Sequence, residues 1–445
     1  MPDMGEAPKP KPAESYAASQ TLAAPASEWP ADSWWRAYGD SQLSALVEEG
    51  LAGSPTMTAA EARVRRAQAV AAQAGSALKP QIGGQAQLNA AAVELGDLVP
   101  NGPTGIQTAG FGLLRGSYDF DLWGRHRAAL AAATSETQAT QADAAQARLT
   151  LSTAIAAAYA DLAQLYEALD AADEALAVRR RTVELMTQRQ ENGLENRGSV
   201  SQAEAGRAQA ETERAAIEET IALNKNRIAA LLGAGPDRGA AITRPSDAVV
   251  KPFGLPAQLQ AELVGRRPEI VAARLRADAA ASRIKQARAG FYPNVNLSAT
   301  VGGLLLDLFN PSAILLASAG PALSLPIYGG GRTEGEVRQA RAEYDAAVAE
   351  YDRAVTQAFQ EVADVAVSER ALGQRLERSR AALAASQDAY RVANERYRGG
   401  LSTLLDVLRA EDSVIANRRT VADLETRAFV LDVALVRALG GGYGS

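Results

Sequence analysis

The stretch SPTMTAAEAR at residues 54–63 returns as RPEIVAARLR at residues 267–276 of the same chain. Pro80 and Pro293 keep the interval between these two stretches. Four later pairs share a second constant interval: Arg125 with Arg332, Gly193-Leu194 with Gly400-Leu401, Ala203-Glu204 with Ala410-Glu411, and Leu232-Gly233 with Leu439-Gly440. Such an interval is too long for one unit of a solenoid. The sequence therefore predicts an internal duplication of a half-protein.

The composition favours long helices over a thick globular core. The chain has 445 residues, of which 47% are hydrophobic but only 5% aromatic. Much of the hydrophobic fraction is alanine, the best helix former. The net charge of -6 argues against nucleic acid as a partner, because that would need a basic face. The absence of cysteine excludes thiolate nucleophiles, cysteine-based zinc sites and disulfides.

The sequence predicts neither a transmembrane helix nor a signal peptide. No run of about 18 apolar residues is present. Residues 1–30 are rich in Pro, Ala and Ser and predict an extended N-terminal tail. Because Asp3 and Glu6 do not fit a signal peptide, we interpret this start as a mature or engineered N-terminus.

Two regions alternate between apolar and polar residues and predict strand pairs, at about 81–122 and about 291–327. In the second pair, Val295, Leu297, Ala299 and Val301 alternate with polar residues. One face of the sheet is then apolar and the other polar. A sheet at a membrane boundary and a half-buried sheet of a soluble protein both give this pattern.

Each strand pair is followed by a predicted helical hairpin, at about 124–232 and about 332–439. Apolar residues recur every three or four positions along 149–183 and 337–365, with the spacing of a coiled-coil seam. At ~1.5 Å per residue, the first helix of each hairpin would be about 100 Å long. Short helices precede the strands; one is expected to open at Asp32 and run through Val47.

The predicted domains are a tail (1–30), a first repeat (31–240), a linker (241–265), a second repeat (266–440) and a C-terminal tail (441–445). Four strands in one chain are too few for a membrane barrel, which needs about eight or more. An open sheet edge is not tolerated in lipid. Three chains would together supply about 12 strands.

The chain resembles outer membrane factors of the TolC/OprM type, closest to the lipoprotein branch attached to RND pumps. The residues that carry the resemblance span nearly the whole chain: WWRAYGDSQL (34–43), SPTMTAAEAR (54–63) and its repeat, RRPEI (266–270), GFYPN (290–294), YRGGL (397–401) and LDVLRAE (405–411). Each motif is weak alone, and their order and duplication make the match specific. The lipidated cysteine usual in this branch is absent from the chain.

The resemblance implies an α+β membrane protein: a homotrimeric 12-stranded β-barrel in outer membrane lipid, continued into the periplasm by a helical coiled-coil barrel. It further implies a passive conduit that exports drugs and small molecules in a tripartite efflux system. The implied partners are a periplasmic adaptor protein and an inner-membrane RND or ABC transporter. Two alternatives stay open: an outer membrane conduit for type I protein secretion, and a soluble coiled-coil scaffold.

The helix tips are the candidate gate. Three copies of Asp406 on a three-fold axis would form an anionic ring, a usual device for selecting cations. The alternatives are that Asp406 is a solvated surface residue or caps the returning helix. The first repeat has Ser199 at the matching position. The other candidate gate residues are Leu404 and Leu405, which could exclude water, Arg409, which could pair with Asp406, and Tyr397 and Ser402, which flank the turn.

The turns themselves have two compatible interpretations. Glycine followed by leucine is the pattern of a helix end with a hydrophobic contact. In the family, the same tips receive the adaptor. The residues concerned are Gly193, Leu194, Gly399, Gly400 and Leu401.

Catalytic and metal sites are not predicted. His126 is the only histidine, and no cysteine is available to complete a metal site. Residues 329–332 (GGGR) could suggest an anion site at a helix start. Their first-repeat counterpart is 123–125 (WGR), without the glycine run, so a strand-to-helix joint is expected instead. The sequence predicts a non-enzyme without a cofactor.

Overall fold

A computed structural model describes residues 5–12, 15–16, 22, 24–94, 104–246, 254–257, 259–305 and 313–444. The chain forms two compact units. The first comprises residues 1–10, 63–141 and 272–352, and the second comprises residues 11–62, 142–271 and 353–445. Each unit therefore draws on both sequence repeats. Along the described ranges, no helix is both long enough and apolar enough to cross a membrane.

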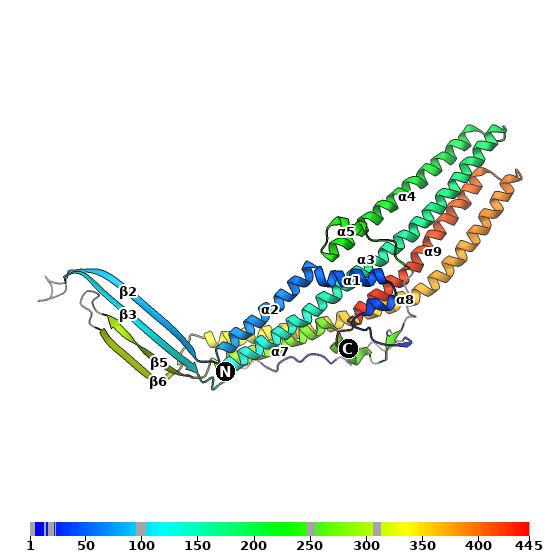
Figure 1. The fold of residues 1–445 in the computed structure, drawn as a ribbon. Helices are drawn as coiled ribbons and strands as arrows, with labels where there is room; N and C mark the ends of the chain where they lie inside the picture. The colour runs from blue at the N-terminus through cyan, green and yellow to red at the C-terminus, as the bar shows by residue number, and fades with distance from the viewer. Residues whose placement is uncertain are drawn as a thin grey trace. The chain divides into compact units, whose positions relative to one another are not determined.

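The duplication predicted from sequence is present in the order of the elements (Figure 1). The first repeat gives α1 (Ser41–Gly53), α2 (Pro55–Ser76), β2 (Gln81–Glu94), β3 (Thr104–Asp119), α3 (Arg125–Glu191) and α4 (Arg197–Leu232). The second gives α6 (Leu259–Arg266), α7 (Pro268–Ala289), β5 (Asn294–Leu305), β6 (Ala313–Ser324), α8 (Arg332–Arg398) and α9 (Leu404–Ala438). The long helices α3 and α8 have 67 residues each. The predicted order of the strand pairs and long helical hairpins is confirmed.

The first unit contains one antiparallel sheet in the order β2-β3-β5-β6. The central pair, β3 with β5, runs from Gly110 opposite Leu305 to Asp119 opposite Asn296, and it joins the two repeats. Because β2 and β6 are the outer strands, each has one edge that does not pair within the sheet.

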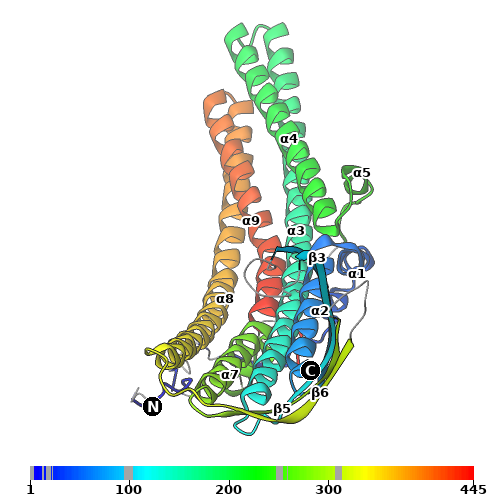
Figure 2. The same cartoon turned by 90° about the vertical axis from the view of Figure 1, so that its left-hand side faces the viewer.

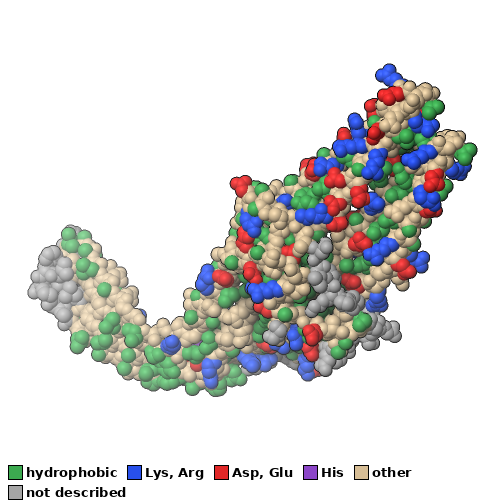
Figure 3. All heavy atoms as spheres, turned by 45° about the vertical axis from the view of Figure 1, so that its right-hand side comes forward, with side chains coloured by type: hydrophobic (Ala, Val, Ile, Leu, Met, Phe, Trp, Pro, Cys, Tyr) green, Lys and Arg blue, Asp and Glu red, His purple; other side chains and the backbone are tan. Residues whose placement is uncertain are grey.

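The register gives the sheet one apolar and one polar face. Opposite residues of antiparallel strands share a face, and successive residues alternate. One row across the sheet is Gly84, Leu114, Val301 and Ala317, and the next is Gly83, Arg115, Thr300 and Ser318. On the apolar face Ile82 is 82% exposed and Leu114 57% exposed. Figure 3 shows hydrophobic side chains along the sheet and charged ones over the helices. The predicted two-faced sheet is confirmed.

Glycines turn the chain from strand to helix at corresponding places in the two repeats. Gly124 has φ +72° directly before α3, while Gly330 and Gly331 have φ +60° and +84° directly before α8. This left-handed region suits glycine. The glycine-rich segment is thus the predicted strand-to-helix joint.

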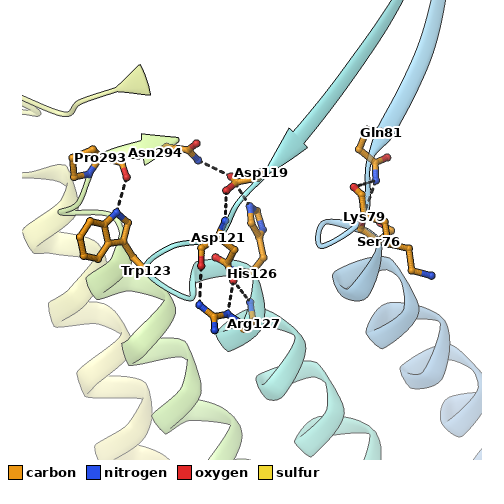
Figure 4. A network of polar contacts seen from close by, with 10 residues as sticks. All are labelled: Ser76, Lys79, Gln81, Asp119, Asp121, Trp123, His126, Arg127, Pro293 and Asn294. Carbon is orange, nitrogen blue, oxygen red and sulfur yellow. Dashed lines mark hydrogen bonds and ion pairs between the residues drawn. The ribbon is translucent and has the colours of Figure 1, made fainter. Parts of the chain in front are cut away.

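Asp121 fixes the first of these joints (Figure 4). Its carboxylate accepts hydrogen bonds from the backbone N–H groups of His126 and Arg127, both at 2.9 Å. His126 Nε2 lies 3.1 Å from Asp119 Oδ2, which also accepts from Asn294 Nδ2 at 2.7 Å. The single histidine therefore belongs to a structural network that ties β3 and β5 to the start of α3.

The predicted single helix from Asp32 to Val47 is wrong. The segment forms a 3-10 helix, η2 (Trp34–Tyr38), followed by α1. Gly39, at φ +73°, ends the first helix, and the Asp40 carboxylate caps the second by accepting the Leu43 N–H at 2.9 Å. A left-handed glycine followed by an N-cap residue separates the two elements.

A large apolar cluster of the second unit surrounds this corner. Side chains of η2 and α1 pack with residues of α3, α4 and α9. Tyr159, a buried member of this cluster, donates from its hydroxyl to Asp40 Oδ2 at 2.7 Å. The tail also meets the linker here, because β1 (Ala26–Ser27) pairs in parallel with β4 (Leu255–Pro256). A short helix, α5 (Pro236–Ala240), follows α4.

In the second unit, α3 lies between α4 and α9, and α9 lies between α3 and α8 (Figures 1 and 2). Ion pairs hold each hairpin together: Arg214 with Asp173 at 2.5 Å between α4 and α3, and Arg380 with Glu425 at 2.6 Å between α8 and α9. The parts of the predicted linker at 247–253 and 258, and the last residue of the predicted C-terminal tail, lie outside the described residues.

Candidate functional site

Both hairpins turn in the same way at their tips. Gly193 has φ +71°, and the N–H of Leu194 donates back to the carbonyl of Arg189 at 2.8 Å. Gly400 has φ +73°, and the N–H of Leu401 makes the equivalent 2.8 Å bond. These bonds satisfy carbonyls that the ending helix leaves unpaired. The interpretation as helix-ending glycines is confirmed.

The leucine after each glycine points into solvent. Leu194 is 64% exposed and Leu401 is 73% exposed. Gly399 precedes the second turn and is also exposed. Each tip therefore presents an apolar side chain beside a backbone turn.

Asp406 caps α9. Its Oδ2 accepts the backbone N–H of Thr403 at 3.0 Å and the Thr403 hydroxyl at 2.7 Å. In return, Thr403 Oγ1 accepts the Asp406 N–H at 3.4 Å, which completes a capping box. The side chain is exposed. Bonds from the Thr403 hydroxyl and N–H, and then the charge of Arg409, hold the pKa of the Asp406 carboxyl below its usual value.

Ser199 occupies the matching position of α4. There Asn196 is the N-cap residue, and its Oδ1 accepts the Ser199 N–H at 3.1 Å. At both helix starts the N-cap side chain accepts the N–H of the third helical residue, but only α9 has a carboxylate at that third position and a complete capping box. The exchange of Asp406 for Ser199 between the repeats therefore does not prevent side-chain capping of α4.

The two candidate leucines have different environments. Leu404 is buried and packs with Met186, Tyr397 and neighbouring residues of α9 in a cluster beneath the tips. Leu405 is 45% exposed. Successive residues of a helix point about 100° apart, so one faces the hairpins and the other faces away.

Glu195 connects the two tips. Tyr397, at the end of α8, donates from its hydroxyl to Glu195 Oε1 at 2.5 Å. Ser199 donates from its hydroxyl to Glu195 Oε2 at 2.9 Å. Two predicted gate residues from different repeats therefore meet at one carboxylate. We call Tyr397, Glu195 and Ser199 the tip triad.

Burial and charge shape this contact. Tyr397 is 4% exposed, and the guanidinium carbon of Arg189 lies 4.7 Å from its ring centroid. Burial, followed by the bond to Glu195, raises the pKa of Tyr397 to about 12. The same bond is the main reason why the pKa of Glu195 is below its usual value. At neutral pH the tyrosine is therefore a neutral donor and the glutamate a charged acceptor.

Glu195 was missed by the sequence analysis. The glutamate follows Gly193-Leu194 directly, in a turn where a solvated charge is the ordinary expectation. Its counterpart after Gly400-Leu401 is Ser402, whose hydroxyl donates to the carbonyl of Ala393 at 3.3 Å. Ser402 thus closes its own turn. The signal available in the sequence was that the first repeat has a glutamate where the second has a serine.

A second polar contact lies between α3 and α9. Arg179 Nη1 is 3.1 Å from Glu411 Oε1, and Thr182 donates from its hydroxyl to Glu411 Oε2 at 3.3 Å. Glu411 is 2% exposed, and burial raises its pKa. Arg179 also pairs with the exposed Asp412. The inner helices of the two hairpins therefore share a buried charge pair that the sequence analysis did not single out.

Nothing in this region indicates metal chemistry. Across the described ranges, no group of three or more His, Asp or Glu side chains is placed to hold a metal ion.

Comparison with known proteins identifies the family. The sequence profile described as "Outer membrane efflux protein" matches residues 46–234 and 259–441. The chain belongs to the outer membrane efflux protein family. The two matched segments contain both strand pairs and both hairpins.

Individual relatives agree with this assignment. The fusaric acid resistance protein FusA of Burkholderia cepacia is 40% identical over 324 residues, or 71% of this chain and 60% of that protein. The multidrug resistance outer membrane protein MdtP of Shigella flexneri is 30% identical over 94% of this chain and 88% of its own length. The outer membrane protein VceC of Vibrio cholerae, known from a crystal structure, has 44% sequence identity to this chain and a TM-score of 0.85. The match covers 93% of this chain and 100% of the VceC chain.

Three predictions are confirmed by these matches. The fold is the TolC-like α+β fold, the protein is an outer membrane efflux protein, and it is not an enzyme. Family membership also argues against a soluble coiled-coil scaffold.

Proposed function

We propose that three copies of the chain form a passive export channel that crosses the outer membrane and continues into the periplasm. The two-faced sheet with outer strands β2 and β6 carries this proposal. Its apolar face suits lipid, and outer-strand edges cannot remain unpaired there. Three four-stranded sheets joined edge to edge would give 12 strands, an even number in the range of known barrels.

The cargo class follows from the relatives. FusA is named for fusaric acid resistance and MdtP for multidrug resistance. We assign drugs and other small molecules to this channel as a class, with an inner-membrane RND or ABC transporter supplying the energy. Deleting the protein should increase drug susceptibility. Reduced yield of a secreted protein with unchanged susceptibility would instead favour the type I secretion conduit.

The hairpin tips are the proposed gate. Asp406 and Leu405 are exposed there and available to a three-fold ring, and Arg409 is exposed on the same helix. The tip triad joins the hairpins within each chain and would hold them in one arrangement. Leu404 supports the gate from inside the hairpins, since it packs against Tyr397 and Met186.

The exposed turns are the proposed docking point for a periplasmic adaptor protein. Leu194 and Leu401 offer apolar contacts beside Gly193, Gly399 and Gly400. Leu194→Glu together with Leu401→Glu should abolish cross-linking to the adaptor while the protein still reaches the outer membrane. Unchanged cross-linking would place the adaptor elsewhere.

Disulfide cross-linking tests the trimer directly, because the chain has no cysteine of its own. Gln85→Cys in β2 is combined with Ser318→Cys or Gly320→Cys in β6, all on the polar face. Within one chain two strands separate these positions, so their Cα atoms are at least about 14 Å apart, too far for a disulfide. Oxidation should yield a product of three linked chains. Gln85→Cys alone is the control. The proposal is contradicted if both cysteine pairs yield monomers and no linked chains.

A further inference from the structure

The end of the sheet that meets the helices differs in charge from the sheet itself. The described strands β2, β3, β5 and β6 together contain one arginine and two acidic residues. At the helical end, β2 follows α2, β3 leads into α3, β5 follows α7 and β6 leads into α8. The register places all four joints at one end of the sheet, and all four belong to the first unit.

Four basic side chains at these joints are exposed and, along the part of the chain that the structure describes, make no ion pair. Lys79 lies between α2 and β2, Arg125 is the first residue of α3, and Lys285 and Arg288 lie in the last two turns of α7. Lys285 and Arg288 are three residues apart on one helix and are therefore neighbours of like charge. We call these four residues the basic collar.

The carboxylates at the same end of the sheet have other partners. Asp121 is buried and pairs with Arg127 at 3.1 Å. Asp278 lies about 10 Å from Lys285 along α7 and offsets one of the four charges at most. The further pairs are Asp119 with His126, Glu136 with Arg283, Glu334 with Arg338, and Glu336 with Arg332. The collar therefore leaves a surplus of positive charge beside the apolar face of the sheet.

Aromatic and large apolar side chains lie at the same joints. Trp123 stacks on Tyr292 with ring centroids 4.6 Å apart, and both rings are exposed. The indole N–H of Trp123 donates to the carbonyl of Pro293 at 2.8 Å (Figure 4). Ile327 and Tyr328, between β6 and α8, are 90% and 92% exposed. Exposed Trp and Tyr beside an apolar surface are typical of the boundary between lipid tails and headgroups.

We propose that the basic collar binds the anionic headgroups of phospholipids in the leaflet that borders the helical end of the sheet. This inference rests on the proposed membrane-spanning function. Arg125 and Arg288 donate paired N–H groups to lipid phosphates, and Lys79 and Lys285 act as point charges. The acyl chains lie along the apolar face of the sheet. A zwitterionic lipid binds more weakly, because its own ammonium group offsets the phosphate charge.

Trp123 supplies the reporter for the test. The full-length protein is reconstituted into phosphatidylcholine vesicles that contain either brominated phosphatidylglycerol or brominated phosphatidylcholine, since bromine quenches tryptophan fluorescence on contact. Trp123→Phe, measured in both series, separates the signal of Trp123 from that of the other tryptophans. Each collar residue is expected to favour the anionic lipid about fivefold. Phosphatidylglycerol should therefore quench Trp123 more strongly than phosphatidylcholine at equal mole fraction.

Paired substitutions identify the residues responsible. Arg125→Gln with Arg288→Gln should reduce the preference for phosphatidylglycerol about tenfold or more, and Arg125→Lys with Arg288→Lys should retain most of it. Lys79→Gln with Lys285→Gln repeats the test on the other half of the collar. The matched control is Arg375→Gln with Arg378→Gln, because it removes two exposed charges, also three residues apart, from α8 in the second unit.

Three results would overturn the proposal. Equal quenching by the two lipids in vesicles that still conduct ions would remove the lipid site and leave the export channel standing, as would a loss in the control as large as in the collar variants. Absence of quenching by either lipid would contradict the membrane-spanning function as well. Sodium phosphate and sodium chloride are compared at equal ionic strength, and a preference that only phosphate removes would indicate a site for free phosphate and not for lipid.

Discussion

The hydroxyl of Tyr397, at the end of α8, lies 2.5 Å from Oε1 of Glu195, in the turn between α3 and α4. One hydrogen bond therefore joins the tips of two hairpins that come from different repeats of the chain. Because Ser199 donates to the other oxygen of the same carboxylate, Glu195 is the shared acceptor of the tip triad. A change in the relative position of the hairpins must lengthen this contact or break it.

Tyr397→Phe removes only the hydroxyl and keeps the packing of the ring against Met186. A hydrogen bond to a charged group contributes about 1.5–3 kcal/mol, so the arrangement held by the triad should become less favourable. We expect a higher single-channel conductance in planar lipid bilayers. Tyr390→Phe is the control, because Tyr390 lies about two turns earlier in α8 and packs against the same apolar cluster. Conductance equal to the wild-type value would mean that the triad does not restrain the tips.

Acid should weaken the same contact. The pKa of Glu195 is lowered mainly by the bond from Tyr397. A lowered acid pKa gives stability that is present above the unfolded value, near 4.3, and is lost as the pH falls through the folded value. Wild-type conductance should therefore rise below about pH 4.3, and that rise should be smaller in Tyr397→Phe. Parallel pH profiles for the two proteins would argue against Glu195 as the titrating group.

Asp406→Ala is expected to raise conductance and antibiotic leakage, because it removes a carboxylate from each subunit of the proposed ring. The substitution also removes the Asp406 half of the capping box of α9, so two further variants separate charge from capping. Asp406→Asn keeps an acceptor for Thr403, and Thr403→Ala removes the capping hydroxyl and keeps the charge. Cation dependence of conductance should change in Asp406→Asn and persist in Thr403→Ala. The reverse result would restrict Asp406 to capping.

The sequence predicted the elements better than their contacts. Repetition located both strand pairs and both hairpins, because period and helix-ending glycines are local signals. The break at Gly39 was missed, since a left-handed glycine inside an amphipathic pattern is read only from its φ angle. Glu195 and Arg179 were missed for a different reason. Their partners are about 200 positions away in sequence, and no local pattern shows which distant side chain a solvated-looking charge will contact.

Asp121→Ala should destabilise the joint between β3 and α3. Burial alone would raise the pKa of this carboxyl, but hydrogen bonds from Arg127 and His126 hold it below its usual value. The loss of a buried charged cap is expected to cost roughly 1–3 kcal/mol near neutral pH. Thermal unfolding followed by circular dichroism should show a lower midpoint, and Asp121→Asn should retain part of the stability.

The difference in stability between wild type and Asp121→Ala should depend on pH with a definite sign. Since the Asp121 pKa is lowered on folding, its stabilisation is present above the unfolded value, near 3.9, and is lost as the pH falls through the folded value. The gap between wild type and Asp121→Ala should therefore shrink on acidification. A gap that stays constant from pH 7 to pH 3 would show that the carboxylate charge is not what holds the joint.

The buried pair of Arg179 and Glu411 should respond unequally to the loss of its two members. Arg179→Met leaves Glu411 charged and 2% exposed without its guanidinium, and such a change typically costs about 3–5 kcal/mol. Glu411→Gln keeps an oxygen for Thr182, and Arg179 keeps its pair with Asp412. We expect a large fall in the unfolding midpoint for Arg179→Met and no fall for Glu411→Gln at pH 7.

The pH profile of Glu411→Gln distinguishes this explanation from simple repacking. Burial raises the pKa of Glu411, so its favourable contribution to folding exists below the unfolded value, near 4.3, and is lost as the pH rises through the folded value. Relative to wild type, Glu411→Gln should become more stable as the pH rises from 4 to 7. Midpoints that move together over this interval would mean that the carboxyl is not penalised by burial, and that the seam between α3 and α9 tolerates its charge.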